Sequence, residues 1–351
     1  MKNRFHVAII GYGKSGKYIH APLIDACDGM KLHAVLKRSG PDTLPERPGV
    51  RVYRNVESLL VDAQVDICVI TTPNHLHFPL ARKALLAGKH VVIDKPFTVT
   101  TEEANSLIQL AHRQKRILTI FQNRRWDGDF LTIKKLIREK AVGNLVEVES
   151  RFDRFRSVLK PDAWKEQDLP GSGILYDLGP HLIDQAIQLF GKPDSIFAVQ
   201  RSQRGGKTDD FFELLLNYET VLVRLRAGML VLDESPRFVI RGDKGAFVKY
   251  GMDPQESALA SGISPKDKNW GKEPLVSYGQ LITLESGNTI TKSIPTEAGV
   301  YTVFYENLKQ TLLGEDTLLV PAEQALQTIT LIDKAIESAK TGKITVLQSL
   351  L

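Results

Sequence analysis

Short apolar runs alternate with helix-like stretches over the first third of the chain. Each run is rich in Val, Ile, Leu or Phe and is bounded by charged or turn residues, as expected of a strand. Because the runs are continuously apolar, both faces of each strand should be buried. This alternation predicts an α/β fold with a doubly wound parallel sheet. The predicted strands span residues 5–10, 31–37, 50–53, 66–71, 90–94 and 117–121.

Two of the intervening helices carry signals at their ends. The helix predicted over residues 79–87 is followed by Gly88, which suits a helix C-terminus. The helix predicted over residues 100–115 opens with Thr100-x-x-Glu103, the spacing of a capping box. Both signals support the alternation of helices and strands.

Beyond residue 123 the pattern changes to longer strands with short connections, which predicts an α+β domain with a large antiparallel or mixed sheet. Helices are expected over residues 130–140 and near 181–190, the second after a glycine-rich turn. Residues 252–287 show little pattern, and helical periodicity returns over 300–313 and 322–340. The strands of this part are predicted over residues 195–202, 211–218, 221–229, 237–241 and 246–250.

The composition of the 351 residues is typical of a soluble globular protein with two domains. The formal charge of +5 comes from dispersed cations among 41 acidic residues, which favours a small anionic ligand over a nucleic-acid partner. The apolar run at 7–10 is too short for a signal peptide or a membrane span, so we expect a cytoplasmic protein without a membrane partner. Cys27, Cys68 and the eight histidines lack metal-site spacing, so no metal is expected.

A glycine-rich motif follows the first predicted strand directly. Gly11-Tyr12-Gly13-Lys14-Ser15-Gly16 has the G-x-G-x-x-G spacing that cradles a pyrophosphate at a helix N-terminus, although a glycine-rich turn without a ligand is the alternative. We therefore predict a dinucleotide-binding Rossmann domain over residues 1–123. Residues 124–351 would form a substrate-binding and oligomerisation domain, with a terminal helix able to pack back on the first.

The end of the second predicted strand reads Lys37-Arg38-Ser39, where NAD-specific sites usually carry a carboxylate. Two cations in this place favour the 2′-phosphate of NADP, and NAD remains possible. The alternative is that Lys37 and Arg38 are solvated turn residues.

Polar residues follow the fourth and fifth predicted strands, at the sheet edge where ligands of doubly wound folds bind. With Asp94-Lys95-Pro96 the chain resembles the Gfo/Idh/MocA family of sugar and polyol oxidoreductases, whose Rossmann domain carries a Glu-Lys-Pro-like tripeptide with a catalytic lysine. The chain departs from the family pattern at two positions. Asp94 stands where the family commonly has Glu, and Lys37 stands where NAD-using members commonly have Asp. At these strand ends we expect coenzyme contacts from Thr72, Pro73, Asn74, His77, Asp94, Lys95 and Pro96.

The resemblance extends over nearly the whole chain. The stretch from Gly171 to His181 is similar to the family's glycine-rich segment followed by D-x-G-x-H, here Asp177-Leu178-Gly179-Pro180-His181. Within the family the chain is most similar to NADP-type scyllo-inositol 2-dehydrogenases, through segments 121–126 and 164–166. The candidate substrate-binding residues are Lys95, Arg125, Trp126, Arg154, Trp164, Asp177 and His181. For each arginine the favoured alternative is a structural ion pair.

The proposed chemical roles follow from hydride transfer at a CH–OH group, in which the substrate hydroxyl loses a proton. His181, with an ordinary pKa of about 6.5, suits the proton acceptor, and Lys95 suits the stabiliser of the developing alkoxide. Asp177, four residues before His181, would orient the imidazole or bind a substrate hydroxyl. The alternatives are a helix cap for Asp177, a core histidine for His181 and a surface lysine for Lys95.

The leading hypothesis is an NADP-dependent dehydrogenase acting on an inositol or a related polyol. Another sugar or aldose dehydrogenase is the second reading, and a non-catalytic dinucleotide-binding regulator is a third, which the presence of both Lys95 and His181 disfavours. The family resemblance also implies a homodimer or homotetramer, although a C-terminal helix could cover the sheet face instead.

Overall fold

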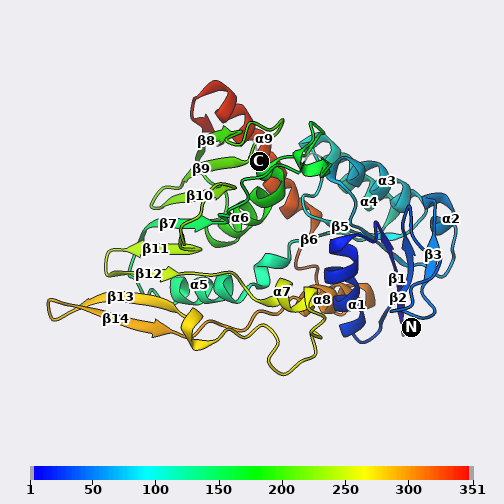
Figure 1. The fold of residues 1–351 in the computed structure, drawn as a ribbon, viewed down its shortest axis with the longest axis horizontal. Coiled ribbons are helices and arrows are strands. Elements are labelled where there is room, and N and C mark those ends of the chain that lie inside the picture. Colours follow the sequence, from blue (N-terminus) through cyan, green and yellow to red (C-terminus); the bar gives the residue numbers. More distant parts are fainter. Residues whose placement is uncertain (1–3, 161, 348–351) are drawn as a thin grey trace. The chain divides into compact units, whose positions relative to one another are not determined.

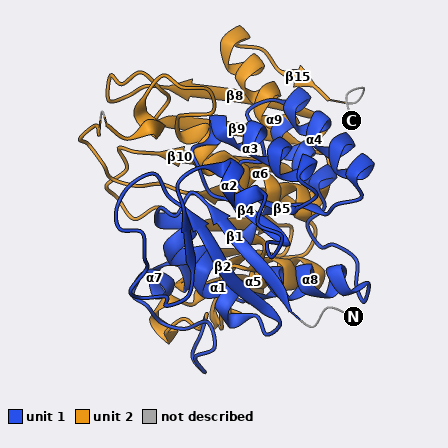
Figure 2. Cartoon of the chain, turned by 90° about the vertical axis from the view of Figure 1, so that its right-hand side faces the viewer, with its two compact units in different colours: residues 1–123, 255–270, 300–329 blue, residues 124–254, 271–299, 330–351 orange. Residues whose placement is uncertain are grey.

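The computed structural model describes residues 4–160 and 162–347, and the chain divides into two compact units. Unit 1 comprises Met1–Asn123, Gln255–Trp270 and Val300–Ile329, and unit 2 comprises Arg124–Pro254, Gly271–Gly299 and Thr330–Leu351 (Figure 2). The sequence analysis had assigned residues 124–351 to the second domain, with a terminal helix able to pack back on the first. Two later segments instead belong to unit 1, because the helices they carry, α7 and α8, contact the glycine-loop turn and α1.

Unit 1 is a Rossmann fold, with a six-stranded parallel sheet in the order β3-β2-β1-β4-β5-β6. The order reverses beside β1, which creates the switch point where such sheets bind ligands. Figure 1 shows α3 and α4 on one side of the sheet and α1 with α8 on the other. The strands are β1 (Phe5–Ile10), β2 (Met30–Leu36), β3 (Arg51–Tyr53), β4 (Ile67–Ile70), β5 (His90–Asp94) and β6 (Leu118–Phe121).

All six strands of unit 1 lie within one residue of their predicted bounds. The strands β1, β4 and β6 are buried on both faces of the sheet, which gives their sequences the continuous apolar signal, whereas β3 has no buried residue. The capping box at α4 forms only in part: the Thr100 hydroxyl accepts the Glu103 N–H at 3.3 Å, but the Glu103 carboxylate accepts from Val99. The helices of this unit are α1 (Ala21–Ala26), α2 (Val56–Leu60), α3 (His77–Leu86), α4 (Thr101–Gln114), α7 (Gln255–Ala260) and α8 (Thr302–Leu313).

Unit 2 contains a nine-stranded mixed sheet in the order β14-β13-β12-β11-β7-β10-β9-β8-β15, in which β7 and β10 pair in parallel and the other neighbours antiparallel. The strands are β7 (Leu145–Arg151), β8 (Ser195–Arg201), β9 (Phe211–Asn217), β10 (Leu222–Gly228), β11 (Phe238–Gly242), β12 (Gly245–Lys249), β13 (Gly279–Glu285), β14 (Asn288–Ile294) and β15 (Thr345–Val346).

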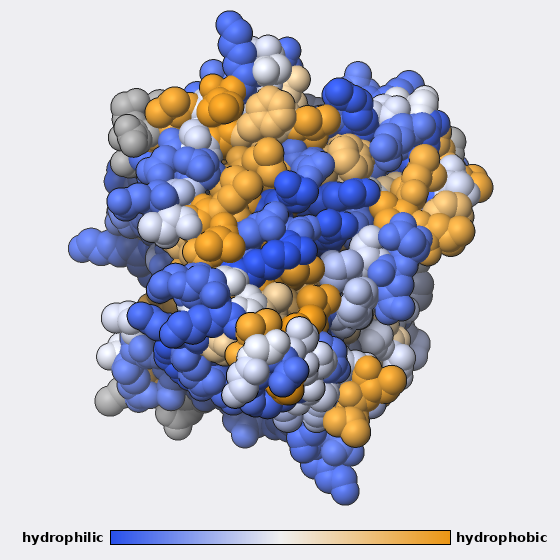
Figure 3. Space-filling view, turned by 90° about the vertical axis from the view of Figure 1, so that its left-hand side faces the viewer, coloured by the Kyte–Doolittle hydropathy of each residue, from blue (hydrophilic) through white to orange (hydrophobic). Residues whose placement is uncertain are grey.

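Two helices, α5 (Gly128–Arg138) and α6 (Ile174–Phe190), lie on one side of this sheet (Figure 1). On β9 and β10 buried positions alternate with half-exposed ones, and the half-exposed set mixes Phe211 and Leu215 with Glu213 and Arg224. The same mixture of hydrophobic and hydrophilic residues is visible on the side of the molecule shown in Figure 3. A last helix, α9 (Ala322–Thr341), runs from unit 1 into unit 2.

The sequence analysis placed two parts of the chain wrongly. Helix α6 begins at Ile174, well before His181, because Asp209 accepts the N–H groups of Ile174 and Leu175 and so caps the helix from a distant loop. The hairpin β13–β14 was not predicted: β13 lies in the stretch 252–287 that showed little pattern, and β14 follows it directly. Its strands are mostly half-exposed or exposed, so they lack the apolar signal of a buried strand.

The described residues contain no helix that is both long and apolar enough to span a bilayer.

Gly279 allows β13 to pack beside β12, and its replacement tests this packing. A Cβ atom at Gly279 would lie 2.1 Å from Cζ of Phe247, a side chain that is only 1% exposed. We expect Gly279→Ala to lower the free energy of unfolding by about 1–3 kcal/mol, the usual effect of overpacking a core. Urea denaturation measures the change. Adding Phe247→Leu should recover part of the loss, and an unchanged midpoint for Gly279→Ala would refute the packing argument.

Candidate functional site

The glycine-rich loop after β1 shows a different role for each glycine. Gly11 has φ 101°, and a Cβ there would meet Cγ2 of Thr72 at 2.9 Å, while a Cβ on Gly16 would lie 2.8 Å from the Gly11 carbonyl oxygen. These two glycines are needed for the turn itself. Gly13 is exposed, and no atom lies within 4 Å of its Cβ position. The open space beside its backbone fits the approach of a dinucleotide pyrophosphate.

Asp94 connects this loop to the lysine of the Asp94-Lys95-Pro96 tripeptide. One carboxylate oxygen accepts the Ser15 hydroxyl at 2.5 Å, and the other accepts the backbone N–H of Lys95 at 2.8 Å. Burial opposes ionisation of Asp94, but His20, Lys95 and Ser15 together hold the pKa of its carboxyl below the usual range. The carboxylate therefore stays charged and fixes the position of both the loop and the Lys95 backbone.

A buried pair supports Asp94 from within unit 1, and the sequence analysis missed it. The imidazole of His20 lies 3.8 Å from Asp94 through Nε2, and its Nδ1 lies 2.7 Å from the Tyr305 hydroxyl. Burial raises the pKa of Tyr305 well above 10, so its hydroxyl keeps its proton. No local pattern indicates this pair, because 285 residues separate its members.

His77, at the start of α3, ties the ends of β4 and β5 together. Its Nε2 lies 2.9 Å from the carbonyl oxygen of Thr72, and its Nδ1 lies 2.8 Å from the carbonyl oxygen of Pro96. Burial lowers the pKa of this imidazole. The predicted Pro73 and Asn74 lie between, where Pro73 precedes a short turn of 3-10 helix over Asn74–Leu76. The Thr72 hydroxyl is buried with no hydrogen-bond partner among the described residues, a feature that fits a bound coenzyme.

Cations gather at the edge where β2 and β3 end. Lys37 follows β2 and is half-buried, and Arg38 and Ser39 are exposed. Arg54, the residue after β3, donates to the Lys37 carbonyl oxygen at 3.1 Å and to Asp42 at 2.9 Å through Nε. The sequence analysis missed Arg54, although its place directly after a predicted strand was a usable signal. Tyr12 and Lys14 lie in the glycine loop beside β1.

In unit 2, Asp177 and His181 lie one turn apart on α6. Lys165 pairs with Asp177 at 2.6 Å from Nζ to Oδ1, and His181 is 4% exposed with its ring edge-on to Phe152, 6.0 Å between centroids. The helix N-cap is Gly173, so the alternative role of Asp177 as the helix cap is wrong. Lys165 is a candidate site residue that the sequence analysis did not name, although Trp164 beside it was named.

The other candidate residues of unit 2 have diverse surroundings. Arg125 is buried and forms a two-bond ion pair with Asp184, at 2.8 Å from Nε and 2.6 Å from Nη2. These two hydrogen bonds indicate that Arg125 and Asp184 form a structural ion pair. Trp126 and Arg154 are half-buried, and Trp164 begins a turn of 3-10 helix over Trp164–Glu166, with its ring centroid 5.7 Å from Lys165 Nζ. Within residues 4–160 and 162–347, no group of three or more histidine, cysteine or acidic side chains could hold a metal ion.

Comparison with known proteins relates both parts of the chain to one family. Residues 5–122 match the Gfo/Idh/MocA model described as an oxidoreductase family NAD-binding Rossmann fold. Residues 134–347 match the model of the C-terminal alpha/beta domain of the same family.

Individual relatives cover nearly the full length. The chain is 42% identical to the uncharacterized oxidoreductase YdgJ of Escherichia coli, covering 97% of this chain and 98% of the relative. It is 35% identical to IolW of Bacillus subtilis, named scyllo-inositol 2-dehydrogenase (NADP(+)), covering 97% and 96%. Among solved structures, the oxidoreductase yvaA of Bacillus subtilis superposes with a TM-score of 0.95 at 34% identity, covering 99% of each chain.

Substituting two glycines of the loop should separate coenzyme binding from folding. Gly13→Ala adds a methyl group into open space, so we expect an unchanged thermal unfolding temperature but dinucleotide binding weakened by at least about tenfold, because the backbone can no longer approach the phosphates. Gly16→Ala adds the same group against the Gly11 carbonyl and should lower the unfolding temperature. Thermal scans and coenzyme fluorescence titration measure the two effects. Full dinucleotide affinity in Gly13→Ala would contradict the expected approach of the phosphates to this loop.

Proposed function

Because the chain belongs to the Gfo/Idh/MocA oxidoreductase family, we propose that it is an NADP-dependent dehydrogenase that interconverts a polyol, an inositol such as scyllo-inositol, and its ketone. The observation that carries this proposal is the Ser15–Asp94–Lys95 connection, which joins the glycine-rich loop to the backbone of Lys95 through one charged carboxylate. The similarity to IolW supports the inositol as substrate.

The residues of the chain supply charge stabilisation and proton transfer. A nicotinamide coenzyme held at the glycine-rich loop would supply the acceptor and donor of hydride for this reaction. Lys95 remains an ammonium and stabilises the negative charge that grows on the substrate oxygen. His181 takes the hydroxyl proton, since an imidazole titrates near neutral pH. In the reverse direction Lys95 polarises the carbonyl and His181 returns the proton.

Asp177 and Lys165 support this chemistry as a charged pair. The 2.6 Å ion pair holds the Asp177 carboxylate beside Lys165, and carboxylate oxygens can accept hydrogen bonds from a substrate hydroxyl. Lys165 is 47% exposed at its side chain, so its ammonium has further N–H groups to donate to a polyol. Alternating donors and acceptors suit a substrate with several neighbouring hydroxyl groups.

The preference for NADP rests on the cations after β2 and β3. Lys37 and Arg54 bring positive charge to the edge where the adenosine ribose of a Rossmann fold lies, and Asp42 neutralises part of the charge of Arg54. Lys37 and Arg38 therefore serve as the candidate partners of a 2′-phosphate.

Substitution of the proposed chemical residues should reduce turnover without reducing coenzyme affinity. We expect Lys95→Met and His181→Ala each to lower kcat for inositol by about 10²–10⁴-fold, the usual range for lost charge stabilisation or general-base catalysis. Asp177→Asn should impair turnover or substrate affinity while folding stays intact. Steady-state kinetics, coenzyme titration and thermal unfolding measure these effects.

A matched control is His112→Ala, which removes a histidine that is 70% exposed on α4 of unit 1. It should leave turnover unchanged. Near-normal turnover in His181→Ala would exclude His181 as the base. Binding of NADP without turnover of any polyol or sugar would favour a dinucleotide-binding regulator.

Reversing the charge of Lys37 tests the coenzyme preference. We expect the unmodified protein to use NADP with higher kcat/KM than NAD, and Lys37→Asp to weaken NADP more than NAD, because a carboxylate repels the 2′-phosphate. Lys31→Asp, at the exposed opposite end of β2, makes the same charge change and should leave the preference intact. Equal kcat/KM with both coenzymes in the unmodified protein would rule out the preference.

A further inference from the structure

A buried arginine joins two loops of unit 2 beside the Lys165–Asp177 pair. Arg204 lies in the connection between β8 and β9, and its side chain is only 5% exposed. Asp210 holds it in place: one carboxylate oxygen accepts the Arg204 backbone N–H at 2.9 Å and its Nε at 2.8 Å, and the other accepts the N–H of Gln203 at 2.6 Å. The guanidinium is therefore fixed from its own loop.

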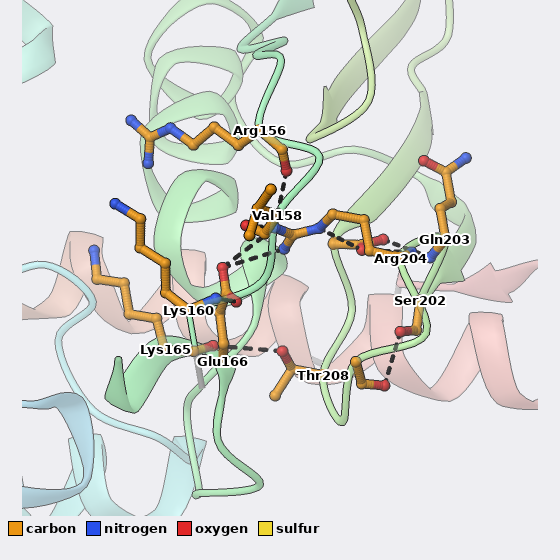
Figure 4. A network of polar contacts seen from close by, with 11 residues as sticks. Arg156, Val158, Lys160, Lys165, Glu166, Ser202, Gln203, Arg204 and Thr208 are labelled. Carbon is orange, nitrogen blue, oxygen red and sulfur yellow. Dashed lines mark hydrogen bonds and ion pairs between the residues drawn. The ribbon is translucent and has the colours of Figure 1, made fainter. Parts of the chain in front are cut away.

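The far side of the guanidinium holds the segment that leads to Lys165. Its Nη1 donates to the carbonyl oxygens of Arg156 at 3.0 Å and Val158 at 3.5 Å, and both terminal nitrogens lie 3.3 Å from Oε1 of Glu166 (Figure 4). The second oxygen of Glu166 accepts the backbone N–H of Lys160 at 2.6 Å. Arg204 and Glu166 thus fix residues 156–160 and 162–166 at several points.

Lys165 stands next to Glu166, so the same contacts fix its position. Its carbonyl oxygen accepts the Gly173 N–H at 3.0 Å and the Thr208 hydroxyl at 3.4 Å, and its Nζ reaches Asp177. Figure 4 shows the Lys165 side chain pointing away from Arg204. Arg204 therefore holds the backbone and the neighbouring carboxylate, and it leaves the ammonium free to face Asp177.

Arginine is suited to this place by its geometry. A planar guanidinium donates in several directions at once, here to two backbone carbonyls and two carboxylates, whereas an ammonium on a flexible stem fixes fewer directions. The two carboxylates also compensate for burial of the charge. The connection between β8 and β9 also packs against the segment that leads to Lys165. A Cβ atom on Gly206 would lie only 3.1 Å from the side chain of Leu159.

We propose that Arg204 is a positioning residue for substrate recognition, which sets the Lys165–Asp177 pair through Glu166 and the 156–166 backbone. The proposal rests on the proposed function in one respect, that Lys165 and Asp177 bind a hydroxyl-bearing substrate. Arg204 itself does not contact Asp177 in this scheme. Its loss should therefore affect KM for the polyol more than kcat or coenzyme binding.

The experiment compares Arg204→Met, Arg204→Lys and the control Arg201→Met, which changes an exposed arginine at the end of β8. We expect Arg204→Met to raise KM for the polyol about tenfold with kcat and NADP affinity within about threefold, as loss of uniform substrate binding predicts. Arg204→Lys should recover part of the affinity, and Arg201→Met should behave as the unmodified enzyme. Equal losses in kcat and NADP affinity would overturn the proposal in favour of a general structural role.

A double-mutant cycle tests whether Arg204 acts through Lys165. In a Lys165→Met background, Arg204→Met should change KM by less than about twofold. The contact between Lys165 and the substrate is already absent there, so Arg204 has no lysine left to position. A full tenfold effect in that background would overturn the proposal.

Amide hydrogen exchange separates this proposal from the proposed function. In Arg204→Met without ligands, exchange should quicken in residues 156–173, while Arg201→Met leaves it unchanged. This readout does not depend on which substrate the enzyme accepts. Faster exchange in a protein that turns over no polyol would leave the positioning role standing and reject only the polyol. Unchanged exchange in a well-folded Arg204→Met protein would overturn the positioning role whatever the substrate.

Discussion

The charged carboxylate of Asp94 is the constraint on which the proposed chemistry of unit 1 depends. A buried carboxylate is stable only when hydrogen bonds and nearby positive charge compensate for lost hydration. Ser15, the Lys95 backbone and His20 provide that compensation. Each partner is thereby held in place by the group it stabilises. The glycine-rich loop and the backbone of Lys95 are thus fixed to a common anion at the end of β5.

The same principle operates around the charged groups of unit 2. Arg204 is buried between Asp210 and Glu166, and Arg125 is paired in a fork with Asp184. These pairs leave few alternative conformations, since a broken pair would strand a buried charge. By contrast, Lys165 keeps an exposed ammonium while it pairs with Asp177. A rigid support with a solvent-accessible charged pair is an arrangement suited to binding a polar ligand.

The shorter side chain of Asp94, where the related family commonly has Glu, also has a consequence in this chain. With one fewer methylene group, its carboxylate stays close to its own strand and accepts the N–H of the next residue at 2.8 Å. His20 and Tyr305 fill the space behind it as a buried, hydrogen-bonded pair. The tripeptide named Lys95 from the sequence, and the catalytic role of this lysine stays a prediction. Nothing in the sequence indicated the His20–Tyr305 pair that supports Asp94.

The sequence by itself determined the strands of the Rossmann sheet, the glycine loop and the family, because these depend on local patterns: continuous burial of short runs and fixed spacing of glycines. It placed β1 and β5 at their observed bounds. It did not determine the start of α6, the β13–β14 hairpin, or the segments after Asn123 that return to unit 1. Tertiary structure decided these features, since Asp209 caps α6 from a separate loop and exposed strands carry no burial pattern. The partners of the candidate residues, Tyr305 behind Asp94 and Arg204 behind Lys165, likewise come from distant positions, and only folding brings their charges and hydrogen-bonding groups together.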